Sequence, residues 1–196
     1  MADLPAHPFR IIAPGVDVPG AGAGAAGAMT LVLERSAFGG GTHATTASCL
    51  EVLASLAPLS GAVLDLGSGT GILAIAALRL GAERAVCVDI NPDAVEIARR
   101  NGAANDLADR IEHVSGDVGD VRGAEFDLVV ANIGGDLLIE AASAIAQAAR
   151  HRGHLLLSGV LRDYADELAE TYGRLGCRVV LRRFAGAFCT TLLRRA

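Results

Sequence analysis

The sequence that decides the fold is Val63-Leu64-Asp65-Leu66-Gly67-Ser68-Gly69-Thr70-Gly71-Ile72. An apolar run leads into three alternating glycines, and an apolar helical pattern begins directly after them. This order predicts a buried strand, a tight turn and a helix N-terminus, where the backbone can approach a polar ligand closely. The next apolar run, Val86-Cys87-Val88-Asp89-Ile90, contains an acid at its end. Because such an acid commonly binds the two hydroxyls of a ribose, the two runs predict a site for a ribose-bearing cofactor.

The spacing of the glycines distinguishes between two classes of cofactor. The dinucleotide fingerprint is G-x-G-x-x-G, with its third glycine beside a pyrophosphate. Here Gly71 follows two residues after Gly69, and Ile72 stands where the fingerprint has glycine. Asp65 also suits a cofactor with a positively charged end, and S-adenosylmethionine has a sulfonium and no phosphate. A plain glycine-rich turn is the alternative for this motif alone. We expect S-adenosylmethionine to be bound by Asp65, Gly67, Ser68, Gly69, Gly71 and Asp89.

Composition excludes several other classes of protein. The chain has 196 residues, of which 52% are hydrophobic, so it can bury a sizeable core. Its net charge of −5 and its lack of tryptophan argue against a basic or base-stacking nucleic-acid surface. The four cysteines lie in apolar segments without C-x-x-C spacing, which indicates buried thiols and no metal site. No apolar run is long enough to span a membrane. We therefore expect a cytoplasmic protein that contacts neither nucleic acid nor membrane.

Strands and helices alternate along most of the chain. Two short strands, at 9–12 and 30–34, can pair as a hairpin, and a helix is expected from Thr42 to Ala57. The strands expected after them are 62–66, 85–89, 110–115, 126–131, 153–159, 177–184 and 187–193. The helices expected between these strands are 71–80, 92–104, 135–150 and 162–175. This pattern predicts an α/β, Rossmann-like fold: a seven-stranded, mostly parallel sheet with an antiparallel C-terminal hairpin and helices on both faces.

Polar residues stand at the carboxyl ends of the expected strands, where such sheets bind their ligands. Asp89 is expected to bind a ribose, with capping of the following helix as the alternative. Asp117 can accept a hydrogen bond from an adenine amino group, or it can simply form a turn. Asn132 is the candidate catalytic residue, because its carbonyl oxygen can accept from a substrate nitrogen. Its alternative role is to cap the helix that begins near Gly135.

The upstream segment reads Ala37-Phe38-Gly39-Gly40-Gly41-Thr42-His43-Ala44-Thr45-Thr46. By chemistry alone it is a capped helix start, with Thr42 as the cap and His43 as a surface residue. The segment resembles the A-F-G-T-G-T-H-x-T-T motif of the PrmA family, the methyltransferases that modify ribosomal protein L-11. The resemblance covers residues 30–193 and includes the run Val129-Val130-Ala131-Asn132-Ile133. It implies a class I methyltransferase whose cofactor contacts are Thr46, Gly67, Asp89 and Asn132, with Phe38 and Ile90 lining the adenosine or methyl-transfer pocket.

The resemblance also implies a reaction, namely N-methylation of amino groups on a protein, with a ribosomal protein as a candidate partner. The family carries a separate N-terminal recognition domain, whereas this chain has only residues 1–36 ahead of the motif. We therefore expect residues 1–196 to be a single methyltransferase domain, with 1–36 as an extension containing a Gly/Ala-rich loop and 37–196 as the catalytic core. A small-molecule acceptor is the alternative, and a non-catalytic cofactor-binding protein is the rival from another class. The sequence departs from the family's pattern at Gly40, Ala44, Gly134-Gly135 and Ala187-Phe188.

Overall fold

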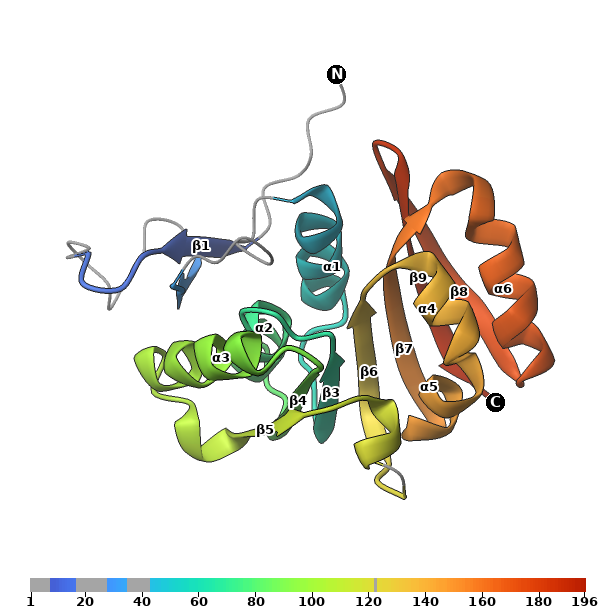
Figure 1. The fold of residues 1–196 in the computed structure, drawn as a ribbon. Coiled ribbons are helices and arrows are strands. Elements are labelled where there is room, and N and C mark those ends of the chain that lie inside the picture. Colours follow the sequence, from blue (N-terminus) through green and yellow to red (C-terminus); the bar gives the residue numbers. More distant parts are fainter. Residues whose placement is uncertain (1–7, 17–27, 35–42, 122) are drawn as a thin grey trace.

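The computed structural model describes residues 8–16, 28–34, 43–121 and 123–196. Its main sheet contains β3 (Ala62–Leu66), β4 (Arg84–Asp89), β5 (Ile111–Ser115), β6 (Phe126–Asn132), β7 (Ala149–Leu161), β8 (Cys177–Ala185) and β9 (Phe188–Arg195). The strands lie in the order β5-β4-β3-β6-β7-β9-β8, and β9 alone runs opposite to the other six. This arrangement confirms the predicted α/β fold with a seven-stranded, mostly parallel sheet and an antiparallel C-terminal hairpin (Figure 1).

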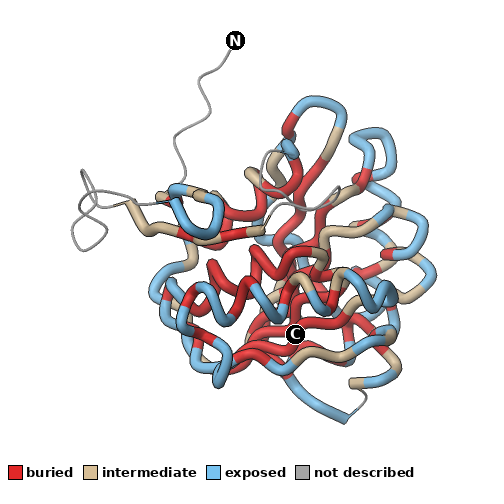
Figure 2. Tube along the Cα trace, turned by 60° about the vertical axis from the view of Figure 1, so that its left-hand side comes forward, coloured by how far each residue is buried: buried red, intermediate tan, exposed pale blue. Residues whose placement is uncertain are grey.

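Helices cover both faces of the sheet (Figure 1). One group is α1 (Ala44–Ser55), α2 (Ile72–Arg79) and α3 (Pro92–Ala104), and the other is α4 (Gly135–Glu140), α5 (Ala142–Ala148) and α6 (Ala165–Arg174). Val129 and Val130 are neighbours on β6, and each is fully buried in the core of a different face. Since successive side chains of a strand point to opposite faces, a sheet covered on both sides needs such continuous apolar runs. Figure 2 shows the resulting buried layer along the strands and the inner sides of the helices.

The order of the strands creates the place for a ligand. The chain passes from β3 outward through β4 to β5, then crosses back to β6 on the other side of β3. Loops that follow β3 and β6 therefore leave the sheet in opposite directions, and a crevice opens between them. Ligands of open α/β sheets bind at such a switch point, outside the carboxyl ends of the strands.

Two predicted helices differ from the structure. The helix expected over 135–150 is broken at Ala141, which ends α4 and begins α5, and the chain is already extended from Ala149 in β7. Ala149 pairs with Phe126 of β6. Residues for which the alanine-rich pattern predicts a helix therefore belong to the sheet. The helix expected over 162–175 begins with a single 3₁₀ turn, η4 (Arg162–Tyr164), before α6. Two further 3₁₀ turns are η2 (Ala108–Arg110) and η3 (Val118–Val121).

The predicted N-terminal hairpin is wrong. The two strands, β1 (Phe9–Ile12) and β2 (Met29–Val32), form a separate sheet, but they pair parallel, with Phe9 opposite Met29 and Ile12 opposite Val32. A tight turn can join only antiparallel strands, whereas parallel neighbours need a long crossover connection. Residues 13–28 are long enough to provide one. Leu31 of β2 is fully buried and joins the core that contains α1 and α2.

Three further findings bear on the kind of protein. All four cysteines are buried and free, as predicted. No three acidic, histidine or cysteine side chains among the described residues are grouped so that they could hold a metal ion. None of the helices in the described part of the chain is both long enough and apolar enough to cross a membrane.

Candidate functional site

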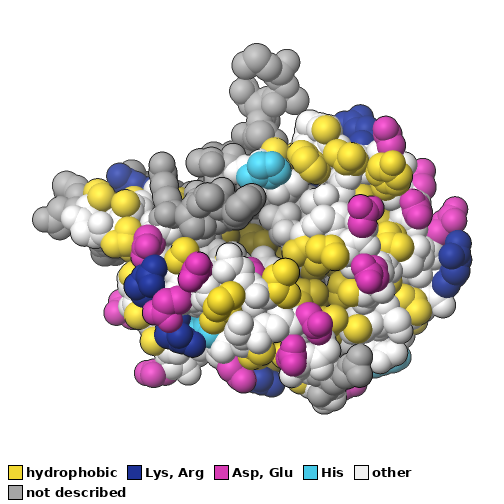
Figure 3. Space-filling view, in the orientation of Figure 1, with side chains coloured by type: hydrophobic (Ala, Val, Ile, Leu, Met, Phe, Trp, Pro, Cys, Tyr) yellow, Lys and Arg dark blue, Asp and Glu magenta, His cyan; other side chains and the backbone are white. Residues whose placement is uncertain are grey.

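A cavity of about 950 Å³ lies at the carboxyl ends of β3, β4 and β6. Its size suits a ligand as large as a nucleoside with an attached amino-acid chain. The described residues that line it include three acids, Asp89, Asp117 and Glu140, and no lysine or arginine. Figure 3 shows hydrophobic side chains at the centre of this face of the molecule, with acidic side chains around them. The described lining therefore offers apolar walls and negative charge, and it includes no lysine or arginine that could bind a phosphate.

The glycine turn forms one wall of this cavity. The backbone N–H groups of Gly67 and Ser68 both donate to Val88 O, at 2.8 and 3.1 Å, which ties the turn to the end of β4. Gly67, Gly69 and Gly71 have φ values of 68°, 53° and 75°, a region that side-chain-bearing residues rarely adopt. A Cβ on Gly67 would also lie 2.2 Å from Cγ2 of Ile133. Glycine at this position therefore allows the turn after β3 and the loop after β6 to approach each other.

Asp89 ends β4 and lines the cavity, as predicted for a ribose-binding acid. Its Oδ2 accepts a hydrogen bond from Gly69 N at 2.8 Å, and its Oδ1 accepts one from Asn91 N at 2.9 Å. Capping of α3 falls instead to Asn91, whose side chain accepts from Asp93 N. Two backbone donors thus fix the carboxylate before any ligand arrives. Each oxygen keeps a lone pair that can accept from a hydroxyl group.

The neighbouring strand ends supply further predicted residues. Ile90 lines the cavity and is 78% exposed, so its side chain offers an apolar surface to a ligand. Asp117 also lines the cavity, and its Oδ1 accepts from Gly119 N at 2.5 Å. Its own N–H donates to Asp120 Oδ2 at 2.8 Å. Asp117 therefore forms a turn, which was the structural alternative, at a position where it also faces the cavity.

Asn132 lies at the end of β6 and is held by α1. Its Nδ2 donates to Oγ1 of Thr46 at 3.4 Å, and both residues line the cavity. The N-cap of α4 is Gly134, so Asn132 does not cap that helix. With its amide nitrogen directed to Thr46, Asn132 presents its Oδ1 as a hydrogen-bond acceptor. A donor such as an amine is the matching ligand group.

Two of the predicted cofactor residues do not line the cavity. Asp65 is only 1% exposed, and its Oδ2 accepts from Ala74 N at 3.0 Å, which supports the first turn of α2. Gly71 is the N-cap of α2 in the left-handed conformation. A Cβ there would meet Ala98 Cβ of α3 at 3.2 Å. Both residues thus shape the turn from behind, and a direct contact with a cofactor stays a prediction.

The buried carboxyl of Asp65 should make the stability of the fold depend on pH. Its pKa is raised to about 7: burial raises the pKa most, the hydrogen bond from Ala74 N lowers it, and the nearby charge of Asp89 raises it. In the unfolded chain the pKa is about 3.9. Between these values the unfolded state releases a proton that the folded state keeps, so the free energy of unfolding falls as the pH rises.

Asp65→Asn should remove this dependence, because an amide cannot ionise and its oxygen can still accept from Ala74 N. We expect the free energy of unfolding of the variant, relative to the wild type, to rise by on the order of 2 kcal/mol between pH 5 and pH 7. Denaturant titrations of both proteins at a series of pH values measure the difference. A difference that is constant with pH would contradict the raised pKa.

Several lining residues were not predicted, and two of them, Gly159 of β7 and Phe188 of β9, come from strands remote in sequence from the glycine turn. The lining residues that were not predicted include His43, Leu137, Glu140, Gly159 and Phe188. His43 caps α1 by accepting from Thr45 N, and its ring meets that of Phe188 edge-on at 5.3 Å. Only Gly159 could have been found from its position along a strand. It follows Ser158, which lies opposite Asn132 on the adjacent strand. The predicted contact Phe38 and the predicted cap Thr42 lie outside the described residues.

Comparisons with known proteins identify the family of this chain. The family model "Ribosomal protein L11 methyltransferase (PrmA)" matches residues 25–194. Ribosomal protein L11 methyltransferase of Hamiltonella defensa subsp. Acyrthosiphon pisum is 41% identical over 76% of this chain and 49% of its own length. The Pelobacter propionicus protein of the same name is 47% identical over 65% of this chain and 42% of its own length. The chain thus spans about half the length of the curated relatives that it matches.

A solved structure shows the same fold over nearly the whole chain. It is the crystal structure of a ribosomal protein L11 methylase from Lactobacillus delbrueckii subsp. bulgaricus, with a TM-score of 0.83 and 24% identity. The match covers 97% of this chain and 96% of that one. The family model and the curated relatives together establish the family. The chain belongs to the ribosomal protein L11 methyltransferase (PrmA) family.

Proposed function

We propose that this chain is an S-adenosylmethionine-dependent methyltransferase that methylates amino groups on a protein. The observation that carries the proposal is the cavity at the switch point of the sheet, which is lined by Asn132 and by Asp89, whose carboxylate is held by two backbone N–H groups. Membership of a family named for methylation of ribosomal protein L11 supports the same reaction and makes a ribosomal protein the first candidate partner. We propose as site residues the predicted residues that line the cavity, together with Phe38. The lining ones are Thr46, Gly67, Ser68, Gly69, Asp89, Ile90, Asp117 and Asn132.

The chemistry of the lining fits S-adenosylmethionine better than a dinucleotide. Asp89 can accept from the two hydroxyls of a ribose, and Ile90 can cover one face of a base. Asp117 can accept from the amino group of that base. A pyrophosphate would find only acidic charges among the described lining residues, whereas a cofactor with a net positive end is attracted by them. S-adenosylmethionine supplies, when bound, a methyl group on a positively charged sulfur.

The protein's own contribution to the reaction is to orient and to desolvate an acceptor amine. Asn132 Oδ1 accepts a hydrogen bond from the amine and so aims its nitrogen lone pair into the cavity. An amine must lose its proton before it can form a bond to the methyl carbon, and a lysine has a reference pKa of about 10.4. The apolar walls, which include Ile133 and Leu137, disfavour the charged form and lower the pKa of the bound amine. Positioning at about 3–3.5 Å then supplies most of the acceleration.

We also propose that residues 37–196 are the catalytic core and that residues 1–36 are an N-terminal extension. All strands of the main sheet fall within 62–195, which supports this division. A cytoplasmic location is proposed on the four free, buried cysteines, which are typical of reducing compartments.

Cofactor binding is the first test of this function. We expect titration calorimetry to detect S-adenosylmethionine and S-adenosylhomocysteine, and to detect no binding of NAD, because no lysine or arginine among the described lining residues can hold its pyrophosphate. Tight binding of NAD would overturn the proposed cofactor class.

The acceptor is tested separately with cofactor that carries a labelled methyl group. The chain is incubated with ribosomal protein L11, with the same protein acetylated on its amino groups, and with a small-molecule extract of cells. Label in the unmodified protein alone supports amino-group methylation. Label in the small-molecule fraction alone would support the alternative acceptor class, and binding of the cofactor without any labelled product would support a non-catalytic role.

A further inference from the structure

We propose that Asn101 of α3 is a positioning residue for cofactor binding, an inference that rests on the proposed function. Asn101 lines no part of the cavity and is absent from every sequence motif described above. It holds the glycine turn that orients Asp89, and at the same time it ties this turn to the end of β2. Because Asn101 links these two segments, we assign it a role in cofactor binding in addition to its role in the packing of α3.

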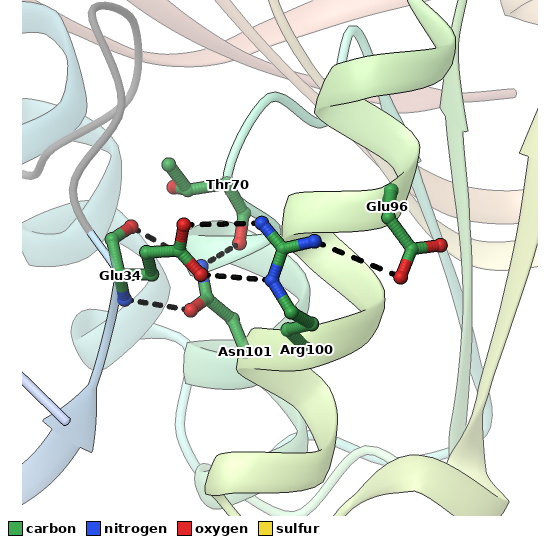
Figure 4. Close-up of polar contacts among 5 residues, drawn as sticks. All are labelled: Glu34, Thr70, Glu96, Arg100 and Asn101. Atoms are coloured by element: carbon green, nitrogen blue, oxygen red, sulfur yellow. Dashed lines mark hydrogen bonds and ion pairs between the residues drawn. The ribbon is translucent and has the colours of Figure 1, made fainter. Parts of the chain in front are cut away.

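The side chain of Asn101 is fully buried, at 0% exposure, and is used at both ends (Figure 4). Its Oδ1 accepts from Glu34 N at 2.7 Å. Its Nδ2 donates to Thr70 O at 2.9 Å and, more weakly, to Glu34 O at 3.5 Å. A planar amide with one acceptor and one donor end satisfies all three groups, which neither a carboxylate nor a hydroxyl can do in this geometry.

The bond to Thr70 acts on the part of the turn that serves the cofactor. Gly69, the residue before Thr70, is the donor to Asp89 Oδ2 at 2.8 Å. The turn is thus fastened on one side to the ribose-binding acid and on the other to Asn101. The two hydrogen bonds are made by adjacent residues, Gly69 and Thr70. The glycines on either side of Thr70 allow this backbone more conformations than other residues would. Without the anchor at Thr70, the turn would hold Asp89 less rigidly, and the affinity for the cofactor would fall.

The other end of the link is fixed by Glu34. Arg100 donates to Glu34 Oε2 from Nε at 2.9 Å and to Oε1 from Nη2 at 3.0 Å, and Glu96 lies beside it (Figure 4). These hydrogen bonds lower the pKa of Glu34. The pair is nearly half exposed, and such surface ion pairs contribute little. The buried amide of Asn101, rather than the ion pair, therefore carries the connection to the turn.

Asn105 provides a matched control, because its side chain bonds to the backbone of β2 and makes no bond to the glycine turn. It lies one helical turn further along α3 and is 1% exposed. Its Oδ1 accepts from Val32 N at 3.0 Å, and its Nδ2 donates to Val32 O at 2.6 Å and to Asn101 O at 2.8 Å. The two asparagines thus share burial and side-chain bonds to the backbone at the end of β2 or just after it. They differ in the bond to Thr70.

The test compares Asn101→Asp with Asn105→Asp. Each carboxylate keeps the acceptor bond, from Glu34 N or Val32 N, and loses both donor bonds. We expect both variants to melt at lower temperature, but only Asn101→Asp should raise the Kd for S-adenosylhomocysteine, by about tenfold or more, while Asn105→Asp should change it less than about twofold. Calorimetry below both melting temperatures measures the two constants. Equal changes in Kd, or an unchanged Kd for Asn101→Asp, would show that Asn101 is merely structural.

A measurement on the wild-type chain covers the case in which a variant does not fold. Coupling between two sites is reciprocal, so cofactor binding should stabilise the bond between Asn101 and Glu34. We expect S-adenosylhomocysteine to slow hydrogen exchange at the Glu34 amide more than at the Val32 amide, as followed by NMR. Equal slowing at both amides would overturn the positioning role. A wild-type chain that binds no S-adenosylhomocysteine would instead overturn the proposed function, and this inference with it.

Discussion

Asn132→Ala is expected to lower the turnover number by about a hundredfold or more while leaving the fold and most of the cofactor affinity in place. The reason is that its Oδ1 acts at the reacting centre, where misalignment of the acceptor is costly. The hydrogen bond that the change removes, from Nδ2 to Thr46 Oγ1, is long at 3.4 Å, so its loss should hardly alter stability. Turnover, melting temperature and the Kd for S-adenosylhomocysteine are measured on the same sample.

The alternative role of Asn132, capping of α4, predicts the opposite results. A helix-capping asparagine, when changed to alanine, lowers stability by about 1 kcal/mol and leaves turnover unchanged. The structure already assigns the cap of α4 to Gly134, which has no side chain to lose. Retained turnover together with a lowered melting temperature would nevertheless remove Asn132 from the catalytic residues.

The sequence predicts the central strands well because strands such as β3 and β6 are covered on both faces. The run over 62–66 is predicted with its observed bounds, since a strand between two layers is mostly apolar, as it is here at every position but Asp65, and the glycine turn marks its end. The helix over 92–104 is likewise predicted correctly, because Asn91 and Pro92 mark its start with a cap and a fixed φ. Where local chemistry and tertiary packing agree, the sequence alone suffices.

The failures fall where tertiary packing overrides the local pattern. Residues 135–150 have a helical, alanine-rich pattern, yet the sheet draws Ala149 into β7, and the helix breaks at Ala141. Nothing in the residues of β1 and β2 distinguishes parallel from antiparallel pairing, since both arrangements accept the same apolar side chains. Only the length of the connection between the two strands indicates that they can pair parallel, and the predicted hairpin does not take this length into account.

The candidate site was predictable on one side only. Gly67, Asp89, Asp117 and Asn132 could be predicted because the rule for strand ends places them together before any contact is known. His43 and Phe188 come from segments far apart in the sequence, and only the packing of α1 beside β9 brings their rings together. Asp65 was predicted from its place beside the glycine turn; in the structure its Oδ2 accepts from Ala74 N of α2, a role that the sequence pattern does not reveal, and its contact with a cofactor stays a prediction.

The second large effect is expected for Asp89→Ala, which should weaken S-adenosylhomocysteine binding by about 1.5–3 kcal/mol, or roughly ten- to more than a hundredfold in Kd. The variant loses a charged acceptor that Gly69 N and Asn91 N hold in place, so a ribose would meet two backbone donors in place of an oriented carboxylate. The same loss should lower the melting temperature, because these donors also lose their partner. Calorimetry is therefore performed at a temperature where circular dichroism shows the variant to be folded.

Asp136→Ala separates this local effect from the general loss of one negative charge. Asp136 is exposed in the first turn of α4, beside the cavity but outside its lining, and it is expected to change the Kd less than about twofold. Asp89→Asn adds a second comparison, because an amide oxygen can still accept from one hydroxyl but carries no charge, and its Kd should fall between those of the wild type and the alanine variant. If Asp89→Ala left the Kd unchanged, the carboxylate would serve only to fasten the turn after β3 to the start of α3, and the ribose would have to be bound by other residues of the cavity.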